Sequence, residues 1–373
     1  MGVNQALLLS GFLESETTSM ALYADGLNSA LRKYAPGKFI YSEFTPKMLL
    51  PKWILNKWGM RFARFFLYPL QAPHIDGAIT HLLDHGYAHL FYTYKSKKTV
   101  VTVTDLIPVL WWKGRLLVQT KKGMPLTVLY FLHALKRASH IIAISSNTKK
   151  DLIELIGCDP SKISVVPLGV DDIFKPYDKN EKQIARRRLF GYSDQSIILI
   201  TGSQFYKNHE TVLKTLSFLI ANGLDNVILV KTGSVDANWL SLIKKYKLEK
   251  KVINVGFIPR EQMPQLYNSV DLLFFPSIYE GFGWPPLEAM ACGIPAVTSN
   301  VASLPEIMGP IDTMCEPFDY IGFAEKITSL LNSEDYYQSV IRQGLYQSSK
   351  FTWEKIAKKT IEVYNLVDSK NNN

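Results

Sequence analysis

Two glutamates in a loop rich in glycine and proline form the most specific chemical pattern in the sequence. Glu280 and Glu288 enclose the seven residues Gly281–Leu287, which include two glycines and two prolines. Glycine lets a ligand approach the backbone closely, and Pro286 suits the first turn of a helix. A helix start offers free N–H groups and partial positive charge to a phosphate. We therefore expect a phosphate-bearing ligand here, with Glu288 reaching ribose hydroxyls; the alternative is a loop whose acid merely caps a helix.

A lysine in a second loop could complete such a site. The loop Gly202–Asn208 lies between an expected strand at residues 197–201 and an expected helix at residues 210–222. In that position Lys207 can place a positive charge on a diphosphate and stabilise it as a leaving group. The alternative is a solvated lysine without a ligand.

Short apolar strands that alternate with helices must position these loops. The expected strands are residues 5–10, 77–82, 99–103, 141–144 and 163–166, then 197–201, 227–231, 251–255, 272–275 and 296–298. The expected helices are residues 18–33, 125–136, 146–156, 210–222, 238–246, 263–269, 287–292, 323–331 and 353–367. This alternation predicts an α/β protein with doubly wound parallel sheets, whose ligands bind at the carboxyl ends of the strands.

A break in the alternation suggests two domains. Pro167–Asp171, Pro176 and the charged stretch Asp178–Arg188 interrupt the pattern, so we place the interdomain link near them. The expected domains are residues 1–173 and 174–351, facing one cleft. In residues 352–373, a closing helix is expected to pack back on the first domain and to end in a disordered tail.

The span Glu280–Glu306 resembles the hallmark of glycosyltransferase family 4, the group 1 glycosyl transferases. The supporting segments are Ser145–Asp151, Val165–Asp171, Gly202–Asn208 and Phe351–Trp353, so the resemblance covers most of the chain beyond residue 75. It implies a retaining enzyme with the GT-B fold, two facing Rossmann-like domains. It also implies an activity: transfer of a hexose-type sugar from a nucleoside-diphosphate sugar to a glycan or lipid-linked acceptor.

The resemblance also assigns roles to individual residues. The first glutamate of the family's pair contacts the donor sugar and the second binds the ribose, which places these roles on Glu280 and Glu288. The donor-binding set that follows is Gly202, Ser203, Lys207, Asn208, Glu280, Gly281, Phe282, Gly283, Leu287 and Glu288. The family usually has Arg-Lys-Asn where this chain has Tyr206-Lys207-Asn208, so one of two expected phosphate-binding charges is missing.

Polar residues after two strands of the first half are candidates for the acceptor side. They are His81, Asp84, His85, Thr104 and Asp105. Asp105 is expected to orient the acceptor or line the sugar pocket, His85 is expected to do similar work, and both join Glu280 and Lys207 as catalytic candidates. For any single histidine here the alternative is a structural role. The family often has His-Asp where this chain has Thr104-Asp105.

Metal and cofactor chemistry are not expected from this sequence. It contains no Asp-X-Asp pair, which metal-dependent glycosyltransferases of the other major fold use, so we expect no metal and no cofactor besides the donor substrate. The cysteines Cys158, Cys292 and Cys315 lie far apart and form no CxxC pair, which is typical of free thiols in a reducing compartment.

The charge of the chain bears on which classes of partner it could bind. The net charge is +9, but no zinc-finger spacing, RNA-binding motif or arginine-rich tail indicates nucleic acid.

No signal peptide and no run of about 18 apolar residues is visible, so we expect a cytoplasmic protein. Residues 52–68 combine Lys57, Arg61 and Arg64 with adjoining aromatic residues, which suits contact with an anionic membrane surface; the alternative is an ordinary amphipathic helix.

Two other functions remain open at this point. A catalytically weak, sugar-nucleotide-binding subunit of a glycan-assembly complex would account for Tyr206 and Thr104. A nucleotide-sugar epimerase can share the fold, but the loop between Glu280 and Glu288 favours sugar transfer.

Overall fold

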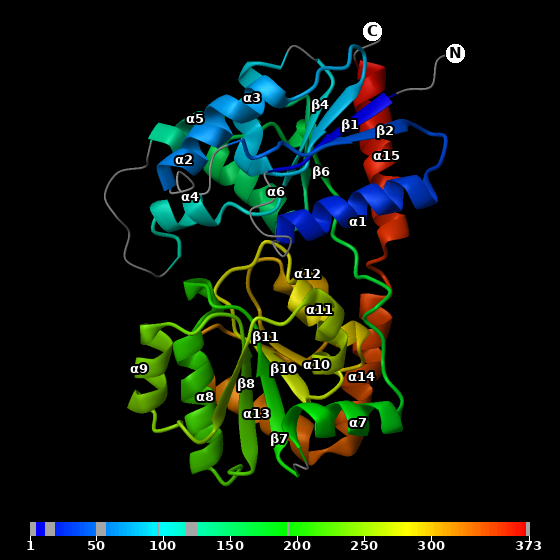
Figure 1. Ribbon diagram of the computed structural model, residues 1–373. Coiled ribbons are helices and arrows are strands. Elements are labelled where there is room, and N and C mark those ends of the chain that lie inside the picture. The colour runs from blue at the N-terminus through cyan, green and yellow to red at the C-terminus, as the bar shows by residue number, and fades with distance from the viewer. Residues whose placement is uncertain are drawn as a thin grey trace. The chain divides into compact units, whose positions relative to one another are not determined.

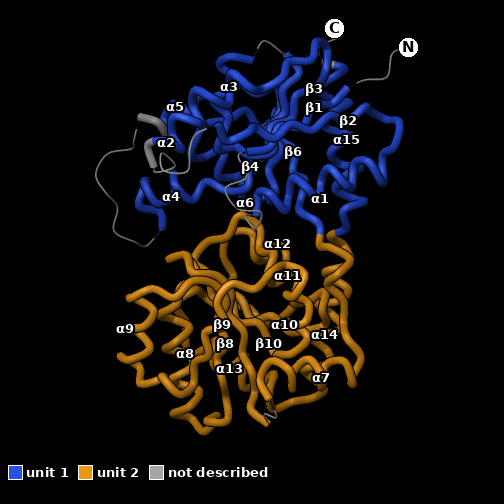
Figure 2. Tube along the Cα trace, viewed as in Figure 1, with its two compact units in different colours: residues 1–169, 352–373 blue, residues 170–351 orange. Residues whose placement is uncertain are grey.

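The chain folds into two compact units, each built on a six-stranded parallel sheet with flanking helices (Figures 1 and 2). The computed structural model describes residues 5–11, 19–49, 57–94, 97–116, 126–191 and 194–370. Unit 1 comprises residues 1–169 and 352–373, and unit 2 comprises residues 170–351. The prediction of doubly wound α/β units is confirmed. The division falls between Gly169 and Val170, a few residues before the expected position.

The sheet of unit 1 has the strand order β2-β1-β3-β4-β5-β6. Its strands are β1 (Gln5–Leu9), β2 (Ile40–Phe44), β3 (Ile79–Leu82), β4 (Thr99–Val103), β5 (His140–Ala143) and β6 (Ile163–Val165). Its helices are α1 (Ser19–Tyr34), α2 (Lys57–Phe62), α3 (Tyr68–Gln71), α4 (Ile107–Trp112), α5 (Leu126–Leu135), α6 (Ser146–Asp151) and α15 (Trp353–Lys370). A π-helical segment, η2 (Ala63–Leu67), joins α2 to α3, and a 3₁₀ segment, η3 (His85–Tyr92), follows β3.

A buried chain of hydrogen bonds ties the C-terminal helix α15 to the sheet of unit 1. The Tyr364 hydroxyl lies 2.8 Å from Nδ1 of His81, and Nε2 of His81 lies 2.8 Å from Oγ1 of Thr102. The Tyr23 hydroxyl of α1 lies 2.9 Å from the same Thr102 oxygen. Trp353, at the start of α15, packs against Gly26 and Gly169, neither of which has room for a Cβ. This chain of polar contacts explains why the last residues belong to unit 1.

The sheet of unit 2 has the strand order β12-β11-β10-β7-β8-β9. Its strands are β7 (Ser196–Ile200), β8 (Val227–Thr232), β9 (Val252–Gly256), β10 (Leu272–Phe275), β11 (Ala296–Ser299) and β12 (Met314–Cys315). Its helices are α7 (Lys179–Phe190), α8 (His209–Ala221), α9 (Ala237–Lys245), α10 (Met263–Tyr267), α11 (Trp284–Ala291), α12 (Leu304–Met308), α13 (Tyr320–Asn332) and α14 (Glu334–Ser348).

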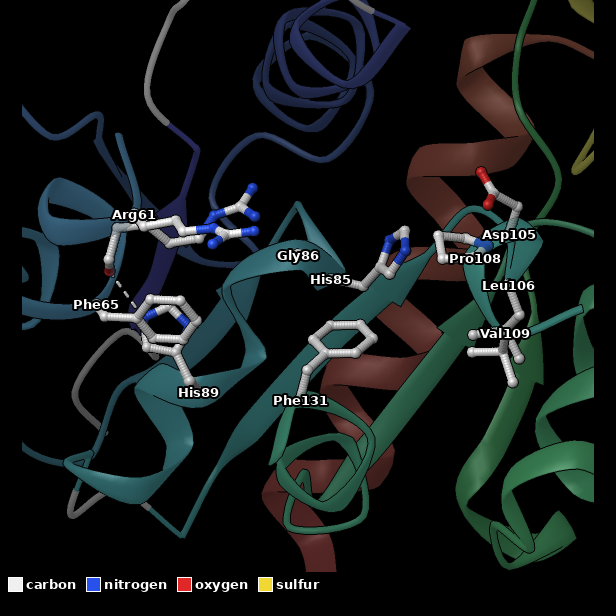
Figure 3. A pocket seen from close by; sticks show the side chains of 11 residues that line it. Arg61, Phe65, His85, Gly86, His89, Asp105, Leu106, Pro108, Val109 and Phe131 are labelled. Carbon is white, nitrogen blue, oxygen red and sulfur yellow. Dashed lines mark hydrogen bonds between the residues drawn. The ribbon is translucent and has the colours of Figure 1, made fainter. Parts of the chain in front are cut away.

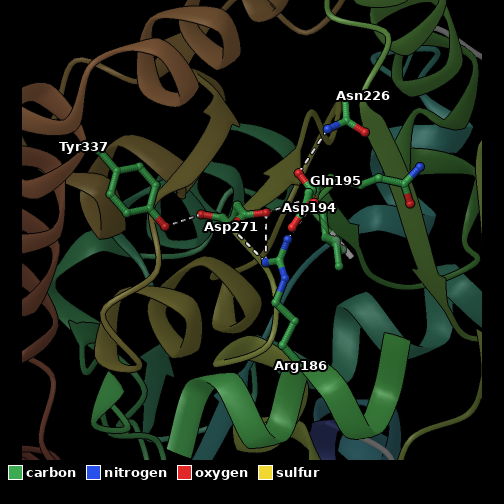
Figure 4. Close-up of polar contacts among 7 residues, drawn as sticks. Arg186, Asp194, Gln195, Asn226, Asp271 and Tyr337 are labelled. Atoms are coloured by element: carbon green, nitrogen blue, oxygen red, sulfur yellow. Dashed lines mark hydrogen bonds and ion pairs between the residues drawn. The ribbon is translucent and has the colours of Figure 1, made fainter. Parts of the chain in front are cut away.

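Asp271 sets the register of the two central strands of unit 2 (Figure 4). Its carboxylate accepts a hydrogen bond from the backbone N–H of Ile197 in β7 at 2.6 Å and forms an ion pair with Arg186 of α7 at 3.0 Å. The Tyr337 hydroxyl of α14 donates to the Asp271 carbonyl oxygen at 2.7 Å. One residue at the start of β10 therefore joins β7, α7 and α14.

The charged stretch at residues 178–188 led us to place the interdomain link near it, but these residues do not form a linker. They form most of helix α7, which begins with a capping box: the Asp178 side chain accepts from the Glu181 N–H, and the Glu181 side chain accepts from the Asp178 N–H. Ala185 is the one buried residue of this helix, so the apolar periodicity that reveals most helices is absent. Strand β2 was missed for a related reason, since only Tyr41 among its five residues is buried.

None of the described helices is long and apolar enough to cross a membrane.

Candidate functional site

Two loops of unit 2 meet at the point where its strand order reverses. Strands β7 and β10 are neighbours, but the chain leaves β7 toward β8 and β9 and returns to the other side of β7 at β10. Ligands of open parallel sheets bind at such a switch point, beyond the carboxyl ends of the strands. The loop after β7 contains Lys207 and the loop after β10 contains Glu280, and the Ile278 N–H donates to the Tyr206 carbonyl at 2.8 Å.

Lys207 and Glu280 form an ion pair at this edge. Nζ of Lys207 lies 2.8 Å from Oε1 of Glu280, and each side chain is 11% exposed. The same Nζ lies 4.2 Å from the centre of the Phe275 ring, which holds the ammonium against an apolar wall. The structure thus brings together two residues that lie 73 positions apart in the sequence. A bound diphosphate would therefore meet a lysine that is paired with a carboxylate and largely shielded from solvent.

Several residues predicted to bind the sugar-nucleotide donor instead stabilise the conformation of these loops. Asn208 adopts a left-handed conformation, and its amide donates to the carbonyl oxygens of Pro276 and Pro317 at 3.0 and 2.6 Å. Ser303 clamps the glycine-rich loop by donating to the carbonyl oxygens of Glu280 and Phe282. The Phe282 and Leu287 side chains are buried, so they hold the loop in place.

The glycines of the loops are required by their backbone conformation. Gly202 has φ +87° and Gly283 has φ +112°, both in the region that favours glycine. A Cβ at Gly202 would lie 2.9 Å from the Lys207 side chain. Gly283 is the N-cap of α11, so the helix start faces the glycine-rich loop.

Glu288 lies one turn inside α11 and is held by Arg260, a residue that the sequence reading did not identify. Nη1 of Arg260 donates to Oε1 of Glu288 at 2.8 Å, and the Tyr267 hydroxyl donates to Oε2 at 3.0 Å. On its other side, Arg260 donates through Nε to Oδ2 of Asp171 at 2.8 Å. Arg260 follows β9 in the loop before α10, where nothing in its neighbours marks it as a partner for Glu288.

The electrostatics of Glu288 depend on this arginine. Burial raises the pKa of Glu288, and the Arg260 charge opposes that rise. For Arg260, burial acts to lower the pKa, but the charges of Glu288 and Asp171 outweigh it and raise the pKa above its usual value. The arginine therefore stays charged and opposes protonation of the buried Glu288 carboxyl.

A second buried lysine lies beside the Gly202–Asn208 loop. Nζ of Lys231 donates to the carbonyl oxygens of Ser234 and Thr232 at 2.8 and 3.1 Å and lies 3.4 Å from Oγ of Ser203. Lys231 is fully buried in β8, and burial lowers its pKa. In the sequence this residue lies at the end of the expected strand at residues 227–231, and it was not predicted as a site residue. It places a second ammonium group next to the loop that contains Tyr206.

The acceptor-side candidates of unit 1 divide into two groups. His85, Thr104 and Asp105 lie together: Oγ1 of Thr104 is 3.4 Å from Nδ1 of His85 and 3.4 Å from Oδ2 of Asp105. His81 is instead fully buried with both ring nitrogens hydrogen-bonded, and burial lowers its pKa to about 3, so it serves the core. Asp84 caps η3 by accepting from the Gly86 N–H at 2.7 Å.

His85 and Asp105 line a cavity of about 290 Å³ within unit 1. Figure 3 shows Arg61 on one side of the cavity and Asp105 on the other, with His85 and Phe131 between them. Arg64, Phe65 and His89 also contribute to its wall. Arg61, Arg64, Phe65, His89 and Phe131 were not among the residues predicted for the acceptor side; Arg61 and Arg64 were expected at a membrane surface instead.

Metal ligands do not cluster in the described part of the chain: no group of three or more His, Cys, Asp or Glu side chains there could hold an ion.

Comparison with protein families gives two adjoining matches. The sequence profile described as Glycosyl transferases group 1 matches residues 181–346. The profile described as Glycosyltransferase Family 4 matches residues 31–173. Together the two matches span most of both units.

Curated relatives include enzymes that transfer mannose. The chain is 31% identical to the serotype-specific mannosyltransferase WbdA of Escherichia coli over 71% of its own length, which corresponds to 33% of that protein. It is 28% identical to O-antigen chain mannosyltransferase B of Escherichia coli over 63% of this chain and 62% of that protein. The chain thus spans about a third of WbdA and less than two thirds of the second relative.

Solved structures share the fold. Sucrose-phosphate synthase from Thermosynechococcus elongatus superposes with a TM-score of 0.77 at 20% identity, over 97% of this chain and 99% of that chain. Anabaena HepE, solved with UDP and glucose, superposes with a TM-score of 0.73 at 14% identity, over 96% of this chain and 98% of that chain. At these identities the likeness concerns the fold alone, and the expected GT-B fold is confirmed.

Removing the Arg260 charge should destabilise the protein in a pH-dependent way. In Arg260→Met the buried Glu288 carboxylate loses its cation, which we expect to cost about 3 kcal/mol of unfolding free energy at pH 8. A carboxyl whose pKa is higher in the folded state binds more protons when the protein is folded. The free energy of unfolding of the protein therefore falls as the pH rises from the unfolded-state pKa to the folded-state pKa of that carboxyl. The deficit, measured by chemical denaturation, should therefore be smaller at pH 5 than at pH 8.

Two further variants separate this effect from lost packing. The double variant Arg260→Met/Glu288→Gln should recover part of the stability, because no buried charge is left unpaired. The exposed Arg188→Met should leave the unfolding free energy nearly unchanged. An equal deficit at both pH values would show that Arg260 does not hold Glu288 as an anion.

Proposed function

This chain belongs to the group 1 glycosyl transferases of glycosyltransferase family 4, and we propose on that basis that it transfers a hexose-type sugar from a nucleoside-diphosphate sugar to a glycan or lipid-linked acceptor. The observation that carries the proposal is the placement of Lys207, Glu280 and Glu288 at the carboxyl edge of one parallel sheet. A sugar-nucleotide donor requires three groups from the protein: a cation for its phosphates, a hydrogen-bonding partner for its sugar, and another for its ribose.

The chemistry assigned to these groups is displacement at the anomeric carbon of the donor. The bond between that carbon and the diphosphate oxygen breaks, a bond to the acceptor oxygen forms, and the acceptor proton passes to a donor phosphate oxygen. Lys207 and the N-terminus of α11 stabilise the negative charge that develops on the leaving diphosphate. Attack from the same face as departure retains the anomeric configuration.

Positive charge from the protein substitutes for a metal ion in this proposal. Lys231 lies 3.4 Å from Ser203 and adds to the potential at the Gly202–Asn208 loop, where Tyr206 stands in place of the usual arginine. When the donor binds, Lys207 would shift part of its hydrogen bonding from Glu280 to the diphosphate, and Glu280 would then contact sugar hydroxyls. Glu288 keeps lone pairs for the ribose although Arg260 and Tyr267 hold both its oxygens.

Mannose is the sugar to test first. Several relatives are named mannosyltransferases, and their names point to surface polysaccharide synthesis. UDP and glucose, which occupy HepE, form the second donor to test.

Contact with a membrane surface is part of the proposal. The helical run α2-η2-α3 exposes Phe62, Phe66 and Leu70, which are 49%, 60% and 84% exposed and follow one another at four-residue intervals. Phe62 and Phe66 stack at 5.2 Å between ring centres, and exposed Arg61 adjoins them. An apolar stripe with a cation beside it suits an anionic bilayer. Phe65 instead faces the cavity of unit 1, and residues 52–56 lie outside the described part of the chain.

A donor screen tests the enzymatic proposal. Purified protein is mixed with UDP-, GDP-, ADP- and TDP-sugars, with and without EDTA, and donor hydrolysis and melting temperature are measured. We expect one donor to stabilise the protein by about 2.7 kcal/mol at a hundredfold excess over its dissociation constant. We expect slow hydrolysis that EDTA leaves unchanged.

Variants of the donor site sharpen the screen. Lys207→Ala should lower turnover by about 100- to 1000-fold, the usual effect of removing one electrostatic group from a transition state. Lys214→Ala, an exposed lysine of α8, is the matched control. Tight donor binding without any turnover, even with acceptor and membrane supplied, would favour the alternative of a sugar-nucleotide-binding subunit, for which Tyr206 speaks.

Membrane contact is tested with vesicles. The double variant Phe62→Ser/Phe66→Ser should bind vesicles of phosphatidylglycerol at least about tenfold more weakly, since burial of a phenylalanine contributes about 1.5–3 kcal/mol. Ile184→Ser, an exposed apolar residue of α7 in unit 2, should bind as the unmodified protein does. Equal cosedimentation of all three proteins would refute the contact.

A further inference from the structure

The sheet of unit 2 contains a lysine that is fully buried. Lys231 belongs to β8, in which all six residues are buried. Lysine is rarely buried to this extent, because removing an ammonium group from water costs free energy unless other groups take the place of the water. Burial accordingly lowers the pKa of Lys231. The groups around this ammonium therefore decide what it does.

The ammonium of Lys231 is held by oxygen atoms of two loops. Nζ donates to the carbonyl oxygens of Ser234 at 2.8 Å and Thr232 at 3.1 Å, and it lies 3.4 Å from Oγ of Ser203. The centre of the Trp239 ring lies 5.5 Å away, within the range of a cation–π contact. These groups favour the charged ammonium, but each of them is neutral.

Nearby carboxylates compensate this charge only in part. Glu280 is already paired with Lys207. The charge of Asp236 acts on Lys231, but the Asp236 side chain is exposed and accepts from the Trp239 N–H at the start of α9. Solvent weakens the attraction of such an exposed carboxylate. Within the described part of the chain Lys231 forms no ion pair, so a buried positive charge remains beside the donor loop.

Two glycines bring the loops after β7 and β8 into contact. Gly233 has φ +89°, and a Cβ there would lie 2.6 Å from Oγ of Ser203 and 3.5 Å from the carbonyl carbon of Gly202. A Cβ at Gly202 would in turn lie 2.9 Å from the Lys207 side chain. The consecutive residues Gly202 and Ser203 therefore lie beside two different lysines, Lys207 and Lys231.

The charges of both lysines act on the same part of the loop. Nε2 of His209 lies 3.1 Å from the Gly202 carbonyl oxygen. Burial lowers the pKa of His209, and the charges of Lys231 and Lys207 also lower it. The hydrogen bond to Gly202 and the charge of Asp236 act in the opposite direction without reversing the shift. His209 is therefore neutral near pH 7, and the lysines carry the positive charge beside Gly202.

The hydroxyl of Ser203 can transmit this charge to a ligand. It donates to the Ser234 carbonyl at 2.9 Å, and the same carbonyl oxygen accepts from Lys231. When the hydroxyl turns to another acceptor, Ser234 keeps its second donor, so no carbonyl loses its last partner. The hydroxyl oxygen meanwhile remains next to the ammonium, and a hydroxyl that accepts from a charged donor becomes a stronger donor itself.

We propose that Lys231 and Ser203 form a relay, in which the buried ammonium polarises the Ser203 hydroxyl and this hydroxyl donates to the diphosphate of the sugar-nucleotide donor. Ser203 contacts the ligand, and Lys231 is a positioning residue that acts through it. The relay supplies part of the positive potential that the family usually obtains from an arginine where this chain has Tyr206. The inference rests on the proposed function, because it concerns the same donor.

Nucleotide binding tests the relay without any transfer reaction. Calorimetry ranks UDP, GDP, ADP and TDP, and the tightest of them is compared with its own nucleoside, which lacks the diphosphate. Lys231→Met, an uncharged side chain of similar shape, should bind the diphosphate at least about tenfold more weakly, which corresponds to about 1.4 kcal/mol. Its affinity for the nucleoside should be unchanged. Lys244→Met, at an exposed lysine of α9, should bind both ligands as the unmodified protein does.

A double-mutant cycle tests whether Lys231 acts through Ser203. Ser203→Ala removes the hydroxyl and should weaken diphosphate binding by about as much as Lys231→Met does. If the ammonium acts through the hydroxyl, the double variant should lose no more than either single variant. Two independent contributions would instead add to a loss of about 100-fold.

The outcomes separate the relay from the proposed function. Ser203 is a half-buried loop residue, so Ser203→Ala keeps the test valid if Lys231→Met unfolds, which its melting curve shows. Unchanged diphosphate affinity in either folded single variant, an equal loss for the diphosphate and the nucleoside, or additive losses would refute the relay and leave the proposed function in place. If none of the four nucleotides binds the unmodified protein, the relay and the proposed donor site are both wrong.

Discussion

Two carboxylates buried at the edge of one parallel sheet each require a cation, and the site of unit 2 is organised around that requirement. Glu280 is held by Lys207 and Glu288 by Arg260, both at 2.8 Å. A buried carboxylate without a partner would neutralise itself by a rise in pKa and would lose its value as a ligand for hydroxyl groups. The two ion pairs therefore supply a positive charge to each buried carboxylate, and the lysine of one pair also faces the expected position of the diphosphate.

The strand order explains why these partners meet. Lys207 and Glu280 follow β7 and β10, adjacent strands that are far apart in the sequence. Asp271 fixes the register of these strands by accepting from Ile197 and pairing with Arg186, at the edge of the sheet opposite the site. Within unit 1, a comparable buried chain from Tyr23 through His81 to Tyr364 anchors the last helix. Polar contacts in the interior of each unit thus support loops that carry the functional groups.

The sequence predicts the parts of this account that depend on local pattern. Most strands, most helices and the loops containing Lys207 and Glu280 follow from apolar runs, glycines and prolines in fixed order. Arg260 could not be predicted, because its partner Glu288 lies 28 residues away and only the tertiary fold joins them. Helix α7 and strand β2 were missed because they bury too few side chains to produce a periodic signal. His81 was expected near the acceptor because it follows the strand pattern, but its side chain turns into the core, which sequence spacing does not reveal.

The most direct test of the central claim is a crystal structure of the protein with the nucleoside diphosphate that the donor screen identifies. We expect the diphosphate to lie against Lys207 and the start of α11, and the ribose hydroxyls to reach Glu288 while Arg260 remains in place. A nucleotide bound elsewhere, or a ribose that does not contact Glu288, would contradict this expectation.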